Sequence, residues 1–310
     1  ILKIFPSLFK KQQPKKKKLL CFDGGGVRAI AGIVFLNKLE AYSGKKVFDI
    51  FDVFVGTSAG AFNAACFASN EMLASEVKKY WSQEYINKIM KTSYFWDPAS
   101  LIQARPRYDS KGKLEVLDEI FKDTTLGASK KPIISLCYDI EQRHHVVHNS
   151  FSTPNITIKD ALAASSAAPM YFPTHKTQNN QWMIDGSIVT NNPSLISYSL
   201  ASKHYKDEEI SILSIGTGIN SSSIDGKISS KWGGVGWLRN DIMGMMLDSE
   251  IDNDVAHNIL GDSYLRINSS YGKINKFLDD DSEENIERIH LMGMEWWDMF
   301  GEKTIEFIEQ

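Results

Sequence analysis

The stretch FDVFVGTSAGAFNAACFAS, residues 51–69, decides the fold, because a short apolar run meets an alanine-rich segment across a serine between two glycines. The run FDVFV is typical of a buried strand, and the alanine-rich segment predicts a helix. A strand that enters a helix through G-x-S-x-G makes a sharp turn that exposes the serine hydroxyl, a nucleophile elbow. The same pentapeptide also arises by chance in ordinary tight turns, so Ser58 is a candidate nucleophile whose context decides.

A glycine cluster follows the first predicted strand. The apolar run KLLCFD, residues 18–23, leads into DGGGVRA, residues 23–29. Successive glycines let backbone N–H groups point into a cavity, and a following helix adds its positive end, so the cluster predicts an anion-binding nest. A dinucleotide fingerprint is disfavoured, because Ala29 stands at its third glycine position and no acidic residue ends the next strand. The favoured interpretation is an oxyanion hole, with candidates Gly24, Gly25, Gly26, Val27, Arg28 and, from the elbow, Ala59.

A serine nucleophile needs a general base. The Ser, Asp, His order of α/β-hydrolases makes His204 or His257 the base, but both fall in segments that read as helical. Asp185 is the better candidate, because it ends the short apolar run WMID just before a glycine and a polar loop; the alternative is an ordinary Asp-Gly turn. The run HHVVH, residues 144–148, is a weak metal pattern, since a strand points its middle histidine to the opposite face, and no metal site is predicted.

Composition and element order predict the fold class. The chain has 310 residues, 43% of them hydrophobic and 24% charged, which suits a substantial core. Strands alternating with helices predict an α/β fold whose central, mostly parallel sheet is covered by helices on both faces, with a mostly helical C-terminal third that includes a strand at 263–267. No stretch of 18 uncharged apolar residues occurs. The three cysteines lie in apolar segments and predict buried, reduced thiols, hence a cytoplasmic location.

Charge divides the chain into a basic tail, residues 1–17, and a single catalytic domain, residues 18–310. Residues 1–18 hold seven lysines and no acidic residue, so the overall charge of −3 leaves −10 on the remainder. This acidic body argues against a nucleic-acid partner. The tail is interpreted as a solvated, flexible segment; the alternatives are a tether to anionic membrane surfaces, which would make the protein membrane-associated, and a nuclear-import signal.

Further local predictions concern helices, strands and aromatic residues. Helices are expected after the glycine cluster as far as Gly44, over residues 71–90 and 112–121, and after Pro193, while KPIISLCYDI and RHHVVHN predict an adjacent strand pair. The aromatic segment 92–108 (Tyr94, Phe95, Trp96, Tyr108) is interpreted as a surface loop packed on the body, with acyl-chain contact as the alternative. The helical patterns around Trp232, Trp237, Trp296 and Trp297 place these side chains in the core.

The motifs together resemble a known family. The three signatures of patatin-like phospholipases resemble three segments that occur here in the same order: DGGGVRA, GTSAG and DGS. The similarity to plant-type patatins extends from about residue 18 to the C-terminus and includes further segments: ALAASSAAPMYFP, ILSIGTG, KWGGVGWL, SYLRI and LDDDSEENIERI. The resemblance implies a Ser58–Asp185 dyad, an oxyanion hole around Gly25 and Gly26, and lipid acyl hydrolase activity without metal or cofactor. Two positions depart from the pattern: Ala29 replaces a glycine, and Ser187 stands where glycine or alanine is usual.

The expected function is therefore a serine acyl hydrolase of the phospholipase A or lysophospholipase type, acting on fatty-acyl esters at a phospholipid or membrane surface. The alternative is a storage or lipid-binding protein with weak activity, because some patatins are storage proteins. Dependence on a protein activator and delivery into another cell are further expectations from the resemblance, since several bacterial patatin-like toxins need a host protein. Neither the lipid headgroup nor the oligomeric state is indicated by any residue.

Overall fold

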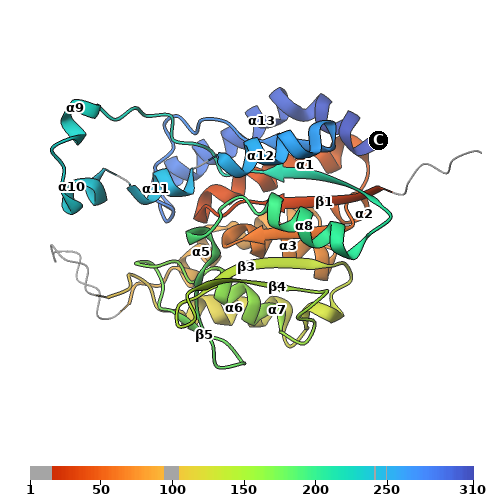
Figure 1. Cartoon of the computed structure of the whole chain (residues 1–310), viewed down its shortest axis with the longest axis horizontal. Coiled ribbons are helices and arrows are strands. Elements are labelled where there is room, and N and C mark those ends of the chain that lie inside the picture. The colour runs from red at the N-terminus through yellow and green to blue at the C-terminus, as the bar shows by residue number, and fades with distance from the viewer. Residues whose placement is uncertain (1–15, 94–104, 241, 249) are drawn as a thin grey trace, which may run out of the picture.

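The central element of the fold is one mixed sheet of eight strands, seen in a computed structural model that describes residues 16–93, 105–240, 242–248 and 250–310 (Figure 1). Its order is β5-β6-β3-β2-β1-β7-β8, with β4 also paired to β3. The strands are β1 (Lys16–Phe22), β2 (Val53–Thr57), β3 (Ile133–Asp139), β4 (His144–Asn149), β5 (His175–Lys176), β6 (Trp182–Asp185), β7 (Glu209–Ile215) and β8 (Tyr264–Ile267). Neighbouring strands β1, β2, β3, β7 and β8 run parallel, which confirms the predicted, mostly parallel sheet.

Helices cover both faces of the sheet, as predicted. Side chains of β1 alternate between two cores: Leu20 and Phe22 join one, and Leu19 and Cys21 join the other. The helices on the first face are α1 (Ile30–Ser43), α3 (Ala59–Asn70), α6 (Lys111–Phe121), α7 (Ile158–Ser165) and α13 (Glu283–Glu309); those on the second are α8 (Ser194–His204) and α12 (Ile251–Leu260). Such two-sided burial requires the continuous apolar strands read from the sequence.

The edge of β3 brings two distant segments together. β4 pairs along one edge of β3, so β2 and β6 share the other edge and follow one another along it. β2 ends at Thr57, which pairs with Leu136, and β6 ends at Asp185, which pairs with Cys137, the next residue of β3. The C-terminal ends of β2 and β6 therefore meet, although 128 residues separate them in the chain.

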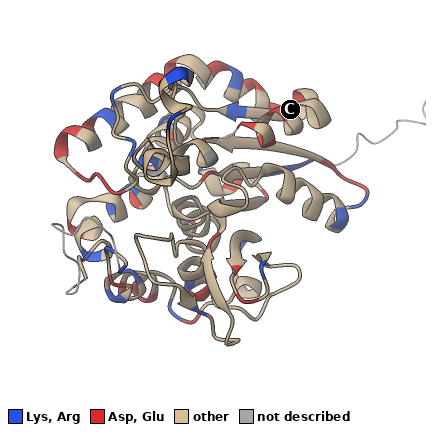
Figure 2. Cartoon of the chain, turned by 60° about the vertical axis from the view of Figure 1, so that its left-hand side comes forward, with Lys and Arg blue, Asp and Glu red and all other residues tan. Residues whose placement is uncertain are grey.

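The C-terminal third is mostly helical, as predicted, and includes β8. The short helices α9 (Gly226–Ser229) and α10 (Gly234–Arg239) stand apart from the helices that cover the sheet, and α11 (Ile242–Leu247) leads back to it (Figure 1). In the view of Figure 2, Lys and Arg are interspersed with Asp and Glu on the helices. Over the described ranges, no helix combines the length and apolar character needed to span a bilayer.

Two local predictions, on the tail boundary and on the helix over residues 71–90, are wrong. β1 begins at Lys16, so Lys16 and Lys17 pair with β7 and are not part of the tail; residues 1–15 lie outside the described residues. The expected helix over 71–90 is instead α4 (Ala74–Val77), the 3-10 turn η2 (Lys78–Trp81) and α5 (Gln83–Ile89), with Ser82 extended between the last two. Beside this break, Trp81 Nε1 donates a hydrogen bond to Asn63 Oδ1 (2.9 Å). Tertiary contacts of this kind override helical periodicity.

The four tryptophans divide into two groups. Trp296 is fully buried and Trp297 packs against the first core, which confirms the prediction for both. Trp232 and Trp237 are half-buried and pack edge-to-face on each other, with ring centroids 5.3 Å apart, beside α10 and outside both cores. The prediction that they are core residues is therefore wrong, because their apolar rings shield one another away from the sheet. The remaining elements are the short α2 (Val47–Ile50) and four other 3-10 turns, η1 (Gly26–Ala29), η3 (Leu126–Ala128), η4 (Gly186–Ile188) and η5 (Gly261–Ser263).

Candidate active site

Ser58 lies between β2 and α3 in a sharp turn. Its backbone angles, φ 54° and ψ −125°, are strained for a residue with a Cβ, and its N–H donates to Ser165 Oγ at 2.9 Å. The flanking glycines are sterically required. A Cβ on Gly56 would lie 2.3 Å from the Ala61 nitrogen, and a Cβ on Gly60 would lie 2.4 Å from the Asp23 carbonyl oxygen. The turn thus has the geometry predicted for a nucleophile elbow.

Asp185 is buried beside Ser58, with only 3% of its surface exposed. The Ser187 N–H donates a hydrogen bond to its carboxylate at 2.9 Å, and the Ser58 side chain lies close enough to favour the ionised form of that carboxylate. The backbone N–H of Asp185 donates to Ala167 O at 3.1 Å, which fixes the end of β6. Burial raises the pKa of Asp185 above its usual value, and the nearby hydroxyl groups of Ser58 and Ser187, the Ser187 N–H and the charge of Lys113 oppose that rise. A carboxylate held in this way can accept a proton from Ser58.

The glycine cluster lies against the serine. A Cβ on Gly24 would be 3.2 Å from Ser58 Cβ and 2.5 Å from Ser187 Oγ, which shows how close the two turns approach. Gly26 has φ +55°, and a Cβ there would meet the Leu278 carbonyl oxygen at 2.0 Å. The cluster continues into the 3-10 turn η1 (Gly26–Ala29) before α1 begins at Ile30.

Fewer backbone N–H groups are available for an oxyanion hole than the sequence predicted, because several already donate hydrogen bonds. The N–H groups of Gly24, Val27 and Arg28 already donate, to Asn191 O (3.4 Å), Leu278 O (2.9 Å) and Gly25 O (3.1 Å) respectively. Those of Gly25, Gly26 and Ala59 have no hydrogen-bond acceptor among the residues that the structure describes. These three amides are the ones available to a developing oxyanion.

The side chain of Arg28 contacts residues of the C-terminal third of the chain. It is almost fully buried, lies 3.9 Å from the Asp248 carboxylate and places its guanidinium 4.7 Å from the centroid of the Tyr271 ring. Such a pairing offsets the desolvation of the charge. Arg28 thereby ties the turn after the glycine cluster to the C-terminal third of the chain.

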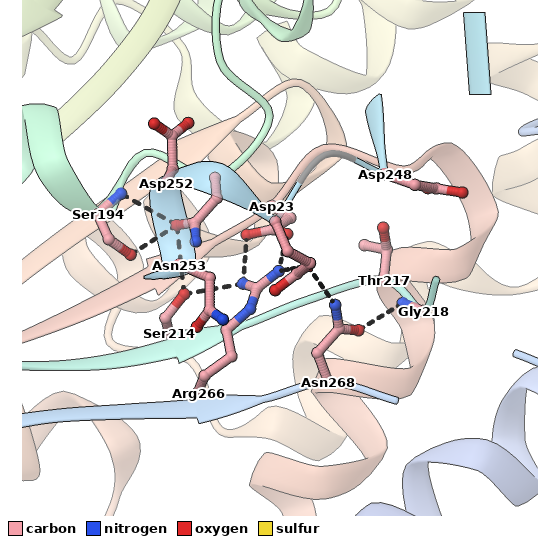
Figure 3. A network of polar contacts seen from close by, with 12 residues as sticks. Asp23, Ser194, Ser214, Thr217, Gly218, Asp248, Asp252, Asn253, Arg266 and Asn268 are labelled. Atoms are coloured by element: carbon pink, nitrogen blue, oxygen red, sulfur yellow. Dashed lines mark hydrogen bonds and ion pairs between the residues drawn. The ribbon is translucent and has the colours of Figure 1, made fainter. Parts of the chain in front are cut away.

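A buried ion pair anchors the residue that precedes the cluster. Arg266, on β8, donates to both carboxylate oxygens of Asp23 at 2.8 and 2.6 Å, and also to Glu250 (3.1 Å) and Ser214 (2.9 Å) (Figure 3). Burial raises the pKa of Asp23 to about 6, against the opposing charge of Arg266. A bidentate pair fixes the orientation of Asp23, and hence the start of the glycine cluster. This network was not predicted.

An apolar cavity of about 120 Å³ opens beside Ser58. It is lined mainly by aromatic and aliphatic side chains, among them Phe62, Trp81, Ile86, Met90, Val116 and Leu117. Tyr108 lines it as well and donates to Asp279 at 2.6 Å, which supports the acyl-contact alternative for this residue; Tyr94, Phe95 and Trp96 lie outside the described residues. An apolar cavity with a few polar groups at one end suits a fatty-acyl chain.

The two histidines that the sequence disfavoured as general bases, His204 and His257, lie in helices α8 and α12. His204 ends α8 and stacks on the Phe151 ring at 4.1 Å, and His257 lies in α12. Within the described part of the chain, no group of three metal-ligating side chains is placed to hold an ion, and His148 is buried on β4. Lys113, which sequence reasoning missed, is buried in the same cavity as Ser58.

Comparisons with known proteins identify the family of the chain. The chain is 28% identical over 346 residues to "Patatin-like protein 4" of Arabidopsis thaliana (92% of this chain, 85% of that protein) and 26% identical over 325 residues to "Patatin" of Solanum tuberosum (89% and 82%). The fold is similar to that of VipD from Legionella pneumophila, with a TM-score of 0.53 at 13% identity, covering 91% of this chain and 67% of that one. The family model "Patatin-like phospholipase" matches residues 20–196, more than half of the chain. The chain therefore belongs to the patatin-like phospholipase family.

Proposed function

We propose that the protein is a serine acyl hydrolase that cleaves fatty-acyl esters of phospholipids or related lipids. Family membership supports lipid acyl hydrolase activity in general. The observation that carries the specific proposal is the position of the buried Asp185 carboxylate beside Ser58, which itself lines an apolar cavity. A nucleophile, a base and a place for an acyl chain thus occur together.

The first half-reaction forms an acyl-enzyme. Asp185 accepts the Ser58 proton as the hydroxyl oxygen attacks the ester carbonyl, and the free amides of Gly25, Gly26 and Ala59 receive the negative charge that develops on the carbonyl oxygen. The tetrahedral intermediate collapses when its C–O bond to the leaving alcohol breaks. The alcohol or lysolipid departs with the proton that Asp185 had accepted.

The second half-reaction releases the fatty acid. A water molecule attacks the acyl-enzyme while Asp185 takes up one of its protons, and the Ser58 oxygen leaves and regains a proton. Asp185 must be ionised at the start of each half-reaction. Because burial raises its pKa, activity is expected to increase from acid toward neutral pH, with its midpoint above the usual range of an aspartate.

Labelling with a fluorophosphonate tests the proposal, together with fatty-acid release from mixed phospholipid vesicles. Wild type is compared with Ser58→Ala and Asp185→Asn, and with Ser222→Ala as a control at an exposed serine. Loss of both labelling and release in the first two variants supports the dyad. A folded wild type that neither labels nor releases fatty acid would contradict it and favour a storage or lipid-binding role.

A further inference from the structure

A lysine is buried where an acyl chain would lie. Lys113, on α6, is 6% exposed and lines the cavity together with Ser58. Its Nζ donates to Ser166 O at 2.9 Å and lies 3.9 Å from the centroid of the Phe172 ring. Lysines are rarely buried without a charged partner, because desolvation of an ammonium group is costly. This position therefore calls for an electrostatic explanation.

The backbone joins Lys113 to Asp185. Ser166 O accepts the hydrogen bond of Lys113, and the next carbonyl, Ala167 O, accepts the backbone N–H of Asp185. Two adjacent peptide groups after α7 thus hold the ammonium and the base in one small region. The two charges attract, and each favours the ionised form of the other.

Among the groups around Asp185, Lys113 is the positive charge that acts on its carboxylate. On β3 the buried Cys137 pairs with Asp185, and its thiol is neutral because burial raises its pKa. The hydroxyl groups of Ser58 and Ser187 carry no charge. The helices that pack against α6 are α5 and α7. On them, Lys88 pairs with Glu119, Lys159 with Asp118 and Asp123, and Asp160 with His175, while Glu84 is exposed to solvent. Arg107 pairs with Asp279, which lines the cavity. Burial lowers the pKa of Lys113 to about 7, against the opposing effect of Asp185.

We propose that Lys113 is a positioning residue that keeps Asp185 ionised when an acyl chain fills the cavity and excludes water. This inference rests on the proposed Ser58–Asp185 dyad. Without the ammonium, the buried carboxylate would lose the positive charge that opposes its desolvation, and it would hold its proton to higher pH. The lysine acts through Asp185, and no bond to substrate is required of it.

The test is the rate of fluorophosphonate labelling as a function of pH, which reports ionisation of the base without a lipid interface. Lys113→Met removes the charge at similar length, Lys113→Arg retains it, and Lys111→Met is the matched control, since Lys111 is exposed on the same helix. We expect the acid limb of Lys113→Met to move up by about one pH unit, roughly a tenfold slower labelling below it. Lys113→Arg and Lys111→Met should keep the wild-type limb.

The melting temperature separates this role from a structural one. Because Lys113 is costly to desolvate, Lys113→Met should melt no lower than wild type. A folded Lys113→Met enzyme that is labelled at Ser58 with an unshifted pH profile would overturn the role of Lys113 while leaving the dyad intact. Absence of labelling in wild type, by contrast, would contradict the proposed function itself.

Discussion

The contact between Gly25 and Thr217 allows the oxyanion hole to be perturbed by one methyl group. A Cβ on Gly25 would lie 2.3 Å from Oγ1, 2.5 Å from Cβ and 2.7 Å from Cγ2 of Thr217. Thr217 is buried, and its hydroxyl donates to Gly24 O at 2.9 Å. In Gly25→Ala, therefore, either the Gly25 and Gly26 amides move or Thr217 moves and releases the Gly24 carbonyl.

The expected effect is on the rate of the chemical step. Misplacing one oxyanion donor costs about 10²–10³ in kcat, or roughly 3 kcal/mol of transition-state stabilisation. KM should change little, because the cavity that would hold the acyl chain is built by other residues. The measurement is the steady-state hydrolysis of a chromogenic ester, with the melting temperature of each variant recorded alongside.

Two variants sharpen this test. Gly226→Ala is the matched control, because a Cβ there meets no atom within 4 Å, and it should leave kcat unchanged. Combining Gly25→Ala with Thr217→Gly removes all three clashing atoms and gives up one hydrogen bond worth about 1 kcal/mol, so kcat should recover at least about tenfold. A wild-type kcat in Gly25→Ala, or a loss that Thr217→Gly fails to relieve in a folded protein, would refute the reasoning.

Three further predictions concern stability and reactivity. Arg266→Met should destabilise the fold by about 3–5 kcal/mol, because it leaves the buried Asp23 carboxylate without its partner. Arg288→Met, which breaks an exposed ion pair with Glu284, should cost less than about 1 kcal/mol. Urea unfolding measures both free energies, and equal effects would contradict the argument. Burial lowers the pKa of His148 below its value in the unfolded chain, so the contribution of this residue to the free energy of unfolding is complete above about pH 6.5 and falls as the pH decreases. His148→Leu should flatten the pH dependence of the free energy of unfolding between about pH 7.5 and 5, and an unchanged slope would exclude His148 as its source. Burial raises the pKa of Cys21 to about 12 and also raises those of Cys66 and Cys137, so a thiol reagent should modify all three only after unfolding; rapid modification of the native protein would disagree.

The sequence predicted the residues whose role is imposed by backbone geometry. Gly56 and Gly60 are needed because another backbone passes within the reach of a Cβ, and such a requirement leaves a local pattern around Ser58. Asp185 was found for a similar reason, since a strand end followed by glycine places its side chain at the edge of a sheet. Whether a given glycine-cluster amide is free was not predictable, because the acceptor for Val27 is Leu278, far along the chain.

Buried charged residues are harder to predict from the sequence than glycines and strand ends. Lys113 occupies an amphipathic helix in which alternating lysines read as a solvated face, and Arg266 is the polar member of a short strand, 243 residues from Asp23. Burial alone distinguishes them from surface lysines and arginines, and burial depends on the packing of α6 and β8 against the sheet. A neutral side chain in either place would satisfy the same hydrophobic pattern, since packing needs only volume and apolar surface there. The charges are therefore best explained by two carboxylates: Asp23, which pairs with Arg266 and holds the start of the glycine cluster, and Asp185, whose ionised form the charge of Lys113 favours.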